Sequence, residues 1–155
     1  ESHGFRPVSN LTGHGVARWK VHCEPQIPAV ADRHDTFVLR EGMVIAIEPF
    51  ATDGKGIVHE QGRAEIFMMM REPRKFKQID SDVYAVIEKM NGLPFARRTF
   101  GALPKDAVET TLTRLLRTGC LSVYPPLNDP DPKVRIAQTE HTMIVTRDGA
   151  EVTTR

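Results

Sequence analysis

The chain has 155 residues, of which 40% are hydrophobic, so it is long enough for one globular domain or part of a larger one and too apolar for a disordered segment. Its 21 Lys and Arg residues nearly balance its 20 Asp and Glu residues, which gives no electrostatic reason to expect nucleic acid or an anionic membrane as the main partner. No apolar run approaches the roughly 20 residues that cross a bilayer, and the polar start has no signal-peptide pattern.

Loops and strands are expected in the first part of the chain. Residues 1–35 are rich in Gly, Pro and His and show strand-like alternation only at 19–23. A mostly apolar strand is predicted over 43–50 and another over 64–70, where the continuous apolar run is typical of a buried strand. The missing initiator methionine and the irregular start indicate a truncated product or a fragment.

Two helices are predicted next, over 81–91 and 105–118, because apolar residues recur in each at the spacing of one helix face. Ser81 is the expected N-cap of the first helix. A short strand at 121–124 follows. Two helices and a strand of this size indicate a small winged-helix-like insertion.

The last part of the chain is predicted to be strand again. A long strand covers 134–146, and a final strand covers 151–154. The Asp148-Gly149 dipeptide between them is typical of a β-hairpin turn.

Two glutamates interrupt these apolar strands. Glu48 is the one charged residue of the strand over 43–50, and Glu140 lies in the middle of the long strand. A buried carboxylate costs several kcal/mol unless a positive group compensates it. Two plainer interpretations stay open: Glu48 can reach water at a strand end, and Glu140 can belong to an exposed polar patch with Gln138 and Thr142.

A histidine between two glycines, Gly13-His14-Gly15, is the third feature. Glycines leave room for one imidazole in a tight cavity. A single histidine is more often a hydrogen-bonded structural residue than a metal ligand. One imidazole together with two carboxylates, however, suits Mn, Fe, Co or Zn. The joint presence of His14, Glu48 and Glu140 therefore favours a divalent metal site.

Three segments read together resemble the type 2 methionine aminopeptidases, and most of all the archaeal members. They are Asn-Leu-Thr-Gly-His-Gly at 10–15, the stretch from Ala-Ile-Glu-Pro-Phe to Asp-Gly-Lys-Gly at 46–56, and Gln-Thr-Glu-His-Thr at 138–142. The resemblance covers essentially the whole chain. The Gly-His-Gly and Ile-Glu-Pro elements also resemble the proline dipeptidases, aminopeptidase P and creatinase, which share the pita-bread fold.

The resemblance implies an α+β fold: the C-terminal half of a pita-bread (creatinase/aminopeptidase-like) fold with a small winged-helix-like helical insertion. Residues 1–72 and 125–155 would form the catalytic part, and residues 73–124 the insertion. In this family the N-terminal half carries two aspartate ligands and another active-site histidine. Because no such half precedes residue 10 here, the fragment alone is expected to be inactive.

The family's functional residues carry over by position. The resemblance implies two divalent metal ions (Co, Mn, Fe or Zn) with His14, Glu48 and Glu140 as ligands, Glu140 bridging the two. His22 matches a histidine that contacts the substrate near the scissile bond, so His22 and Glu140 are the expected catalytic residues. Tyr124 falls where the family lines the pocket for the methionine side chain.

The activity implied is removal of the N-terminal methionine from nascent proteins. A cytoplasmic location is expected, which agrees with the reducing compartment favoured by two distant cysteines, Cys23 and Cys120. The complete enzyme is expected to be a monomer without membrane or nucleic-acid partners, and the resemblance leaves the ribosome open as a partner. Two alternatives remain: a non-catalytic homologue that serves as a binding scaffold, and a proline-specific relative.

Overall fold

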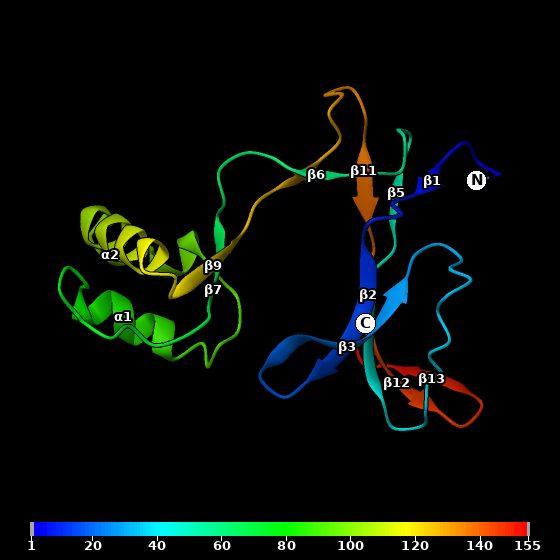
Figure 1. Cartoon of the computed structure of the whole chain (residues 1–155), viewed down its shortest axis with the longest axis horizontal. Helices are drawn as coiled ribbons and strands as arrows, with labels where there is room; N and C mark the ends of the chain where they lie inside the picture. Colours follow the sequence, from blue (N-terminus) through cyan, green and yellow to red (C-terminus); the bar gives the residue numbers. More distant parts are fainter. Residues whose placement is uncertain (1, 155) are drawn as a thin grey trace. The chain divides into compact units, whose positions relative to one another are not determined.

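A computed structural model describes residues 2–154 and divides them into two compact units (Figure 1). Unit 1 runs to Gln61 and resumes at Leu127, and unit 2 comprises Gly62–Pro126. Unit 2 starts earlier than the predicted insertion over 73–124. The reason is that β7 (Ile66–Met69) pairs with β9 (Leu121–Tyr124), so the strand before the helices belongs to the same sheet as the strand after them.

The main sheet of unit 1 has five antiparallel strands in the order β13-β12-β4-β2-β3. The strands are β2 (Thr12–Ala17), β3 (Lys20–Pro28), β4 (Val44–Ile47), β12 (His141–Thr146) and β13 (Gly149–Val152). The predicted hairpin at Asp148-Gly149 is confirmed as the β12–β13 pair. The β2–β3 hairpin lies in the segment expected to be mostly irregular, where glycines hide the strand alternation of β2.

A second sheet of unit 1 has three antiparallel strands in the order β1-β5-β11, and a third has two, β10-β6. The strands are β1 (Arg6–Pro7), β5 (Phe50–Thr52), β11 (Ile136–Gln138), β6 (His59–Glu60) and β10 (Leu127–Asn128).

The two long strands predicted around the glutamates are each broken in two. One breaks at Glu48-Pro49, between β4 and β5, and the other at Thr139-Glu140, between β11 and β12. Pro49 has no backbone N–H for a sheet ladder, which favours a break there. The two breaks lie together, because β4 pairs with β12, β5 pairs with β11, and the Thr139 amide donates to the Pro49 carbonyl at 3.4 Å. Both glutamates therefore lie where a pair of strands leaves one sheet for the other.

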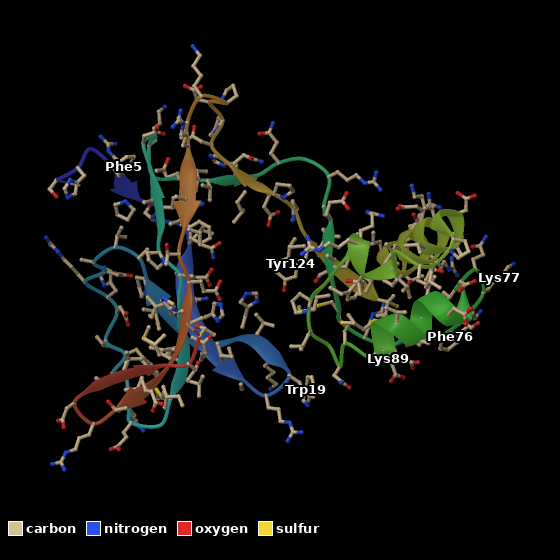
Figure 2. All side chains as sticks on the ribbon, turned by 180° about the vertical axis from the view of Figure 1, so that it is seen from behind. Phe5, Trp19, Phe76, Lys77, Lys89 and Tyr124 are labelled. Carbon is tan, nitrogen blue, oxygen red and sulfur yellow. The ribbon has the colours of Figure 1, made fainter. Side chains whose placement is uncertain are left out.

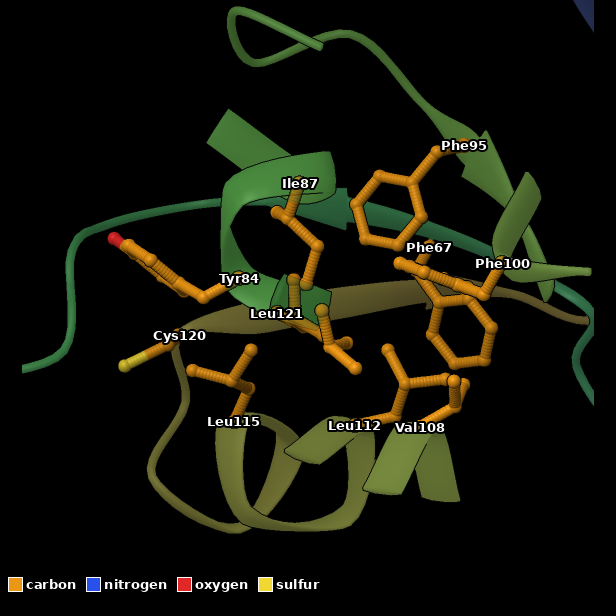
Figure 3. Close-up of a cluster of buried hydrophobic side chains, with 11 residues drawn as sticks. Phe67, Tyr84, Ile87, Phe95, Phe100, Val108, Leu112, Leu115, Cys120 and Leu121 are labelled. Atoms are coloured by element: carbon orange, nitrogen blue, oxygen red, sulfur yellow. The ribbon is translucent and has the colours of Figure 1, made fainter. Parts of the chain in front are cut away.

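Unit 2 packs two helices against a three-stranded sheet (Figures 1 and 3). Its sheet has the order β8-β7-β9. The remaining elements are α1 (Ser81–Glu88), β8 (Phe95–Ala96), the 3-10 helix η1 (Arg97–Phe100) and α2 (Lys105–Arg117). One buried cluster joins the inner face of the sheet to both helices; its members are Phe67, Val83, Tyr84, Ile87, Phe95, Phe100, Val108, Leu112, Leu115, Cys120 and Leu121.

The ends of the helices have identifiable causes. Asp80, not the predicted Ser81, caps α1, because its carboxylate accepts from the amides of Asp82 and Val83 at 3.0 and 3.1 Å. Past the end of α2 lies Gly119 with a φ of 65°, a conformation that favours glycine. No helix formed by residues 2–154 is long and apolar enough to cross a membrane.

Candidate metal centre

His14 lies on β2, an interior strand of the five-stranded sheet between β4 and β3, and is buried. Its two flanking glycines allow the neighbouring strands to approach. A Cβ on Gly13 would lie 2.5 Å from the Ala46 carbonyl oxygen of β4, and one on Gly15 would lie 2.2 Å from the Glu24 carbonyl oxygen of β3. Neither glycine has a positive φ, so close packing rather than backbone freedom explains the motif.

Glu48 contacts His14 directly: its Oε1 lies 2.9 Å from Nε2 of the imidazole. The other ring nitrogen, Nδ1, lies 3.0 Å from the Gly15 carbonyl oxygen. A carbonyl only accepts, so the Gly15 contact is a hydrogen bond in the tautomer that carries a proton on Nδ1, and in that neutral tautomer the lone pair of Nε2 points at the carboxylate. Two such electron-rich atoms approach this closely only with a proton or a cation between them. Nε2 is therefore the ring nitrogen that could hold a metal, with Nδ1–H orienting the ring.

Gln138 connects the two carboxylates. Its side-chain amide donates to Oε2 of Glu48 at 3.0 Å and to Oε2 of Glu140 at 3.4 Å. From the sequence alone, Gln138 belongs to a possible exposed polar patch with Glu140 and to the motif at 138–142, with no role in the site. The signal that identifies it as a site residue is its position two residues before Glu140, at the end of β11.

His22, on the neighbouring strand β3, joins the same cluster. Its ring lies edge-on to the His14 ring, with 4.4 Å between centroids and an interplanar angle of 80°. Burial and the nearby His14 lower the pKa of His22, and the charge of Glu140 opposes this effect. The four residues expected at the catalytic centre, His14, His22, Glu48 and Glu140, thus come together from two strands and two strand breaks.

The electrostatics of the cluster call for a positive charge. Burial raises the pKa of Glu48, and the charge of Glu140 raises it further, while His14 and Gln138 act in the opposite direction. An imidazole nitrogen and two carboxylates are ligands that divalent transition metals accept. Within residues 2–154, however, no three His, Cys, Asp or Glu side chains form a ready-made metal site. The donor set therefore fits a metal chemically without supplying a complete coordination shell.

Tyr124 is described within unit 2, on β9. Its hydroxyl lies 3.3 Å from the sulfur of Met68 on the adjacent strand β7, and burial raises the pKa of the phenol. The tyrosine thus has a partly apolar setting.

Known proteins similar to this chain include metallopeptidases. The sequence pattern of metallopeptidase family M24 matches residues 1–147. Methionine aminopeptidase of Thermococcus onnurineus is 42% identical over 98% of this chain and 52% of its own length, and that of Archaeoglobus fulgidus is 39% identical over 99% and 51%. The chain spans about half the length of these curated relatives.

A solved structure of a thermophilic Arx1 shows the same fold. It covers 97% of this chain and 41% of its own, with a TM-score of 0.74 at 14% sequence identity. The predicted fold class, an α+β pita-bread fold, is confirmed, whereas the winged-helix-like character of the insertion stays a prediction. With both carboxylates and both histidines of the candidate centre inside the matched residues, the chain belongs to metallopeptidase family M24.

Proposed function

We propose that this chain is the C-terminal half of a metal-dependent methionine aminopeptidase that removes the N-terminal methionine of nascent proteins. The observation that carries the proposal is the His14–Glu48 contact, joined through Gln138 to Glu140, in a chain 42% identical to a protein named methionine aminopeptidase. We place the enzyme in the cytoplasm, as a monomer when complete, with the ribosome as a further candidate partner.

His14, Glu48 and Glu140 would hold two divalent ions, Co, Mn, Fe or Zn. When bound, such ions acidify a water and polarise a peptide carbonyl. The remaining ligands would come from a part of the enzyme outside this chain, which agrees with the incomplete donor set of residues 2–154. Alone, the chain would therefore be inactive.

Two residues of this chain would contact the reacting groups. Glu140 lies at a strand break and is exposed, so its carboxylate, which also accepts from Gln138, would be accessible to an attacking water and would accept its proton. His22 projects beside His14 and would donate a hydrogen bond to the peptide as negative charge develops on it. Tyr124 would line the apolar pocket for the methionine side chain.

A chimera tests the proposal: the first half of the Thermococcus onnurineus methionine aminopeptidase is placed before this chain and loaded with Mn or Co. We expect release of methionine from Met-Ala-Ser and no cleavage of an Ala-Pro peptide. Glu140→Ala should abolish the activity, while His59→Ala, which changes an exposed histidine on β6, should leave it unchanged.

The outcomes also separate the alternatives. Cleavage of Ala-Pro alone would indicate a proline-specific peptidase. A folded, metal-loaded chimera without either activity would indicate a non-catalytic scaffold. Full activity of the Glu140→Ala variant would refute the proposed ligand roles.

A further inference from the structure

The near-zero net charge of the whole chain is the sum of two units with opposite net charges. Unit 2 has eleven Lys and Arg residues against seven Asp and Glu residues, a formal charge of +4. The rest of the chain has ten against thirteen, a formal charge of −3. The balance of the whole chain is therefore no argument against an anionic ligand on unit 2.

A small cavity lies along the solvent-facing side of α2. Its volume is about 290 Å³, and it is lined by Gln78, Glu109, Thr110, Thr113, Arg114 and Arg117. Four of these residues recur at the spacing of one helix face, opposite to the face that enters the core with Leu112 and Leu115. The lining supplies guanidinium, hydroxyl and amide donors, which are the groups that bind oxyanions.

The one acid of this cavity is already compensated. Glu109 accepts from Arg97 and from Arg63, the latter at 3.3 Å. By contrast, neither Arg114 nor Arg117 has an ion pair among residues 2–154. The cavity therefore presents two uncompensated positive charges.

Arg114 also has an unmet hydrogen-bonding demand. Its Nε is buried and has no acceptor within the described part of the chain. A buried donor without a partner is destabilising, and more so when it is charged. An oxyanion in the cavity would provide the missing negative charge and additional acceptors.

A plainer explanation is that both arginines favour the C-terminal end of the helix dipole. That end, however, already has a dedicated cation. Arg71 donates from Nε to the Gly119 carbonyl at 3.1 Å, and from Nη2 to the Thr118 carbonyl. The dipole therefore does not account for two further arginines beside a cavity.

We propose that the cavity on α2 binds a phosphate group through Arg114 and Arg117, with Thr110, Thr113 and Gln78 as further donors. Its volume is just below the roughly 300 to 1,000 Å³ of pockets for drug-sized ligands, so it fits a phosphate group rather than a whole nucleotide. The phosphate belongs either to a small phosphorylated molecule or to a nucleic-acid backbone. This site is independent of the proposed peptidase activity.

Calorimetric titration of the chain with inorganic pyrophosphate and, separately, with a short single-stranded RNA distinguishes the two sources. We expect Arg114→Gln with Arg117→Gln to weaken pyrophosphate binding about tenfold or more, because charge-assisted hydrogen bonds are lost. The matched control is Arg98→Gln with Lys105→Gln, which removes the same charge from exposed positions of unit 2 outside this cavity. Arg114→Lys with Arg117→Lys should retain part of the affinity, because this variant keeps the charge and loses the guanidinium fork.

The two titrations together support or overturn the proposed site. Pyrophosphate binding that is weakened in the cavity variant and not in the control variant supports the site. If RNA binding is weakened by the same variant, the phosphate comes from a nucleic-acid backbone; if the chain binds no RNA, it comes from a small phosphorylated molecule. Equal losses in the cavity and control variants would show diffuse attraction and overturn the proposal. So would a chain that fails to bind pyrophosphate, whatever it does with RNA. The near-ultraviolet circular dichroism of the two tyrosines verifies that each variant keeps unit 2 folded.

Discussion

The two units differ in how completely they bury apolar surface. Of the described residues, eleven buried apolar side chains lie in unit 2 and only four, Val8, Ile45, Ala46 and Val58, lie in the longer unit 1 (Figure 3). Most of the large apolar side chains that are exposed also lie in unit 1, among them Trp19 at the tip of the β2–β3 hairpin (Figure 2). Unit 2 has helices over one face of its sheet, and the core forms there.

The packed core and the candidate metal centre of this chain therefore lie in different units. Unit 2 has the self-sufficient core, whereas the candidate metal centre lies in unit 1, on a sheet that buries little. Elements with few buried apolar contacts open at lower free energy than a packed core. The geometry of the centre therefore depends on local devices, namely the glycine contacts, the two strand breaks and the Gln138 bridge.

The core of unit 2 should give the largest effect. Leu112 is 1% exposed inside the cluster, so Leu112→Ala leaves a cavity and should destabilise unit 2 by about 2–5 kcal/mol. Urea unfolding followed by tyrosine circular dichroism measures this, because both tyrosines lie in unit 2. Met70→Ala, at a residue 58% exposed, is the control and should stay within about 0.5 kcal/mol of the parent. A small loss at Leu112 would show that the cluster is not a packed core.

The close approach of strands at the centre gives the next effect. Gly15→Ala pushes a methyl group into the Glu24 carbonyl, and we expect unit 1 to lose about 1–3 kcal/mol. The fluorescence of Trp19, the single tryptophan, reports this loss. Gly149→Ala is the matched control, because its nearest contact would be at 4.0 Å. A Gly15 variant as stable as the control would contradict the packing explanation of the motif.

The units should also unfold separately. Because unit 1 buries less apolar surface, the Trp19 signal should change at a urea concentration lower by about 1 M than the tyrosine signal. Coincident transitions would mean that the chain unfolds as one cooperative body and would remove the contrast drawn above.

The smallest effect concerns the tyrosines of unit 2. Burial raises the pKa of Tyr84, with added contributions from Glu88, Glu72 and Cys120, and burial also raises that of Tyr124. Both phenols should therefore titrate above the ordinary value of 10.0 in the folded chain, as measured by tyrosinate absorbance. The raised values mean that the folded state disfavours tyrosinate, so unit 2 should lose stability as the pH rises above 10. In Tyr84→Phe, one titrating group should remain; an ordinary pKa for either phenol would show that unit 2 is open to solvent.

Periodicity and motifs predicted much of this molecule. The apolar spacing over 81–91 and 105–118 predicted both helices, because each covers a sheet with one face, and the Asp148-Gly149 turn predicted the final hairpin. The N-cap of α1 was predicted one residue too late. Asp80 and Ser81 are both residues that can cap a helix, and in the structure the Asp80 carboxylate accepts from the first amides. The motifs around His14, Glu48 and Glu140 identified the family, and the match to metallopeptidase family M24 confirms it.

Residue order alone fixed which donors the chain carries: one imidazole framed by glycines and two carboxylates among apolar neighbours. Only the tertiary structure decided how they meet, because the two long strands bend together at Glu48 and Glu140 as they pass between sheets. Alternation along a strand cannot show such a bend, nor the bond from Gln138 to carboxylates on two strands, since both depend on pairing between segments about 90 residues apart. The uneven division of charge and core between the units likewise follows from which strands pair, and not from the composition of the chain.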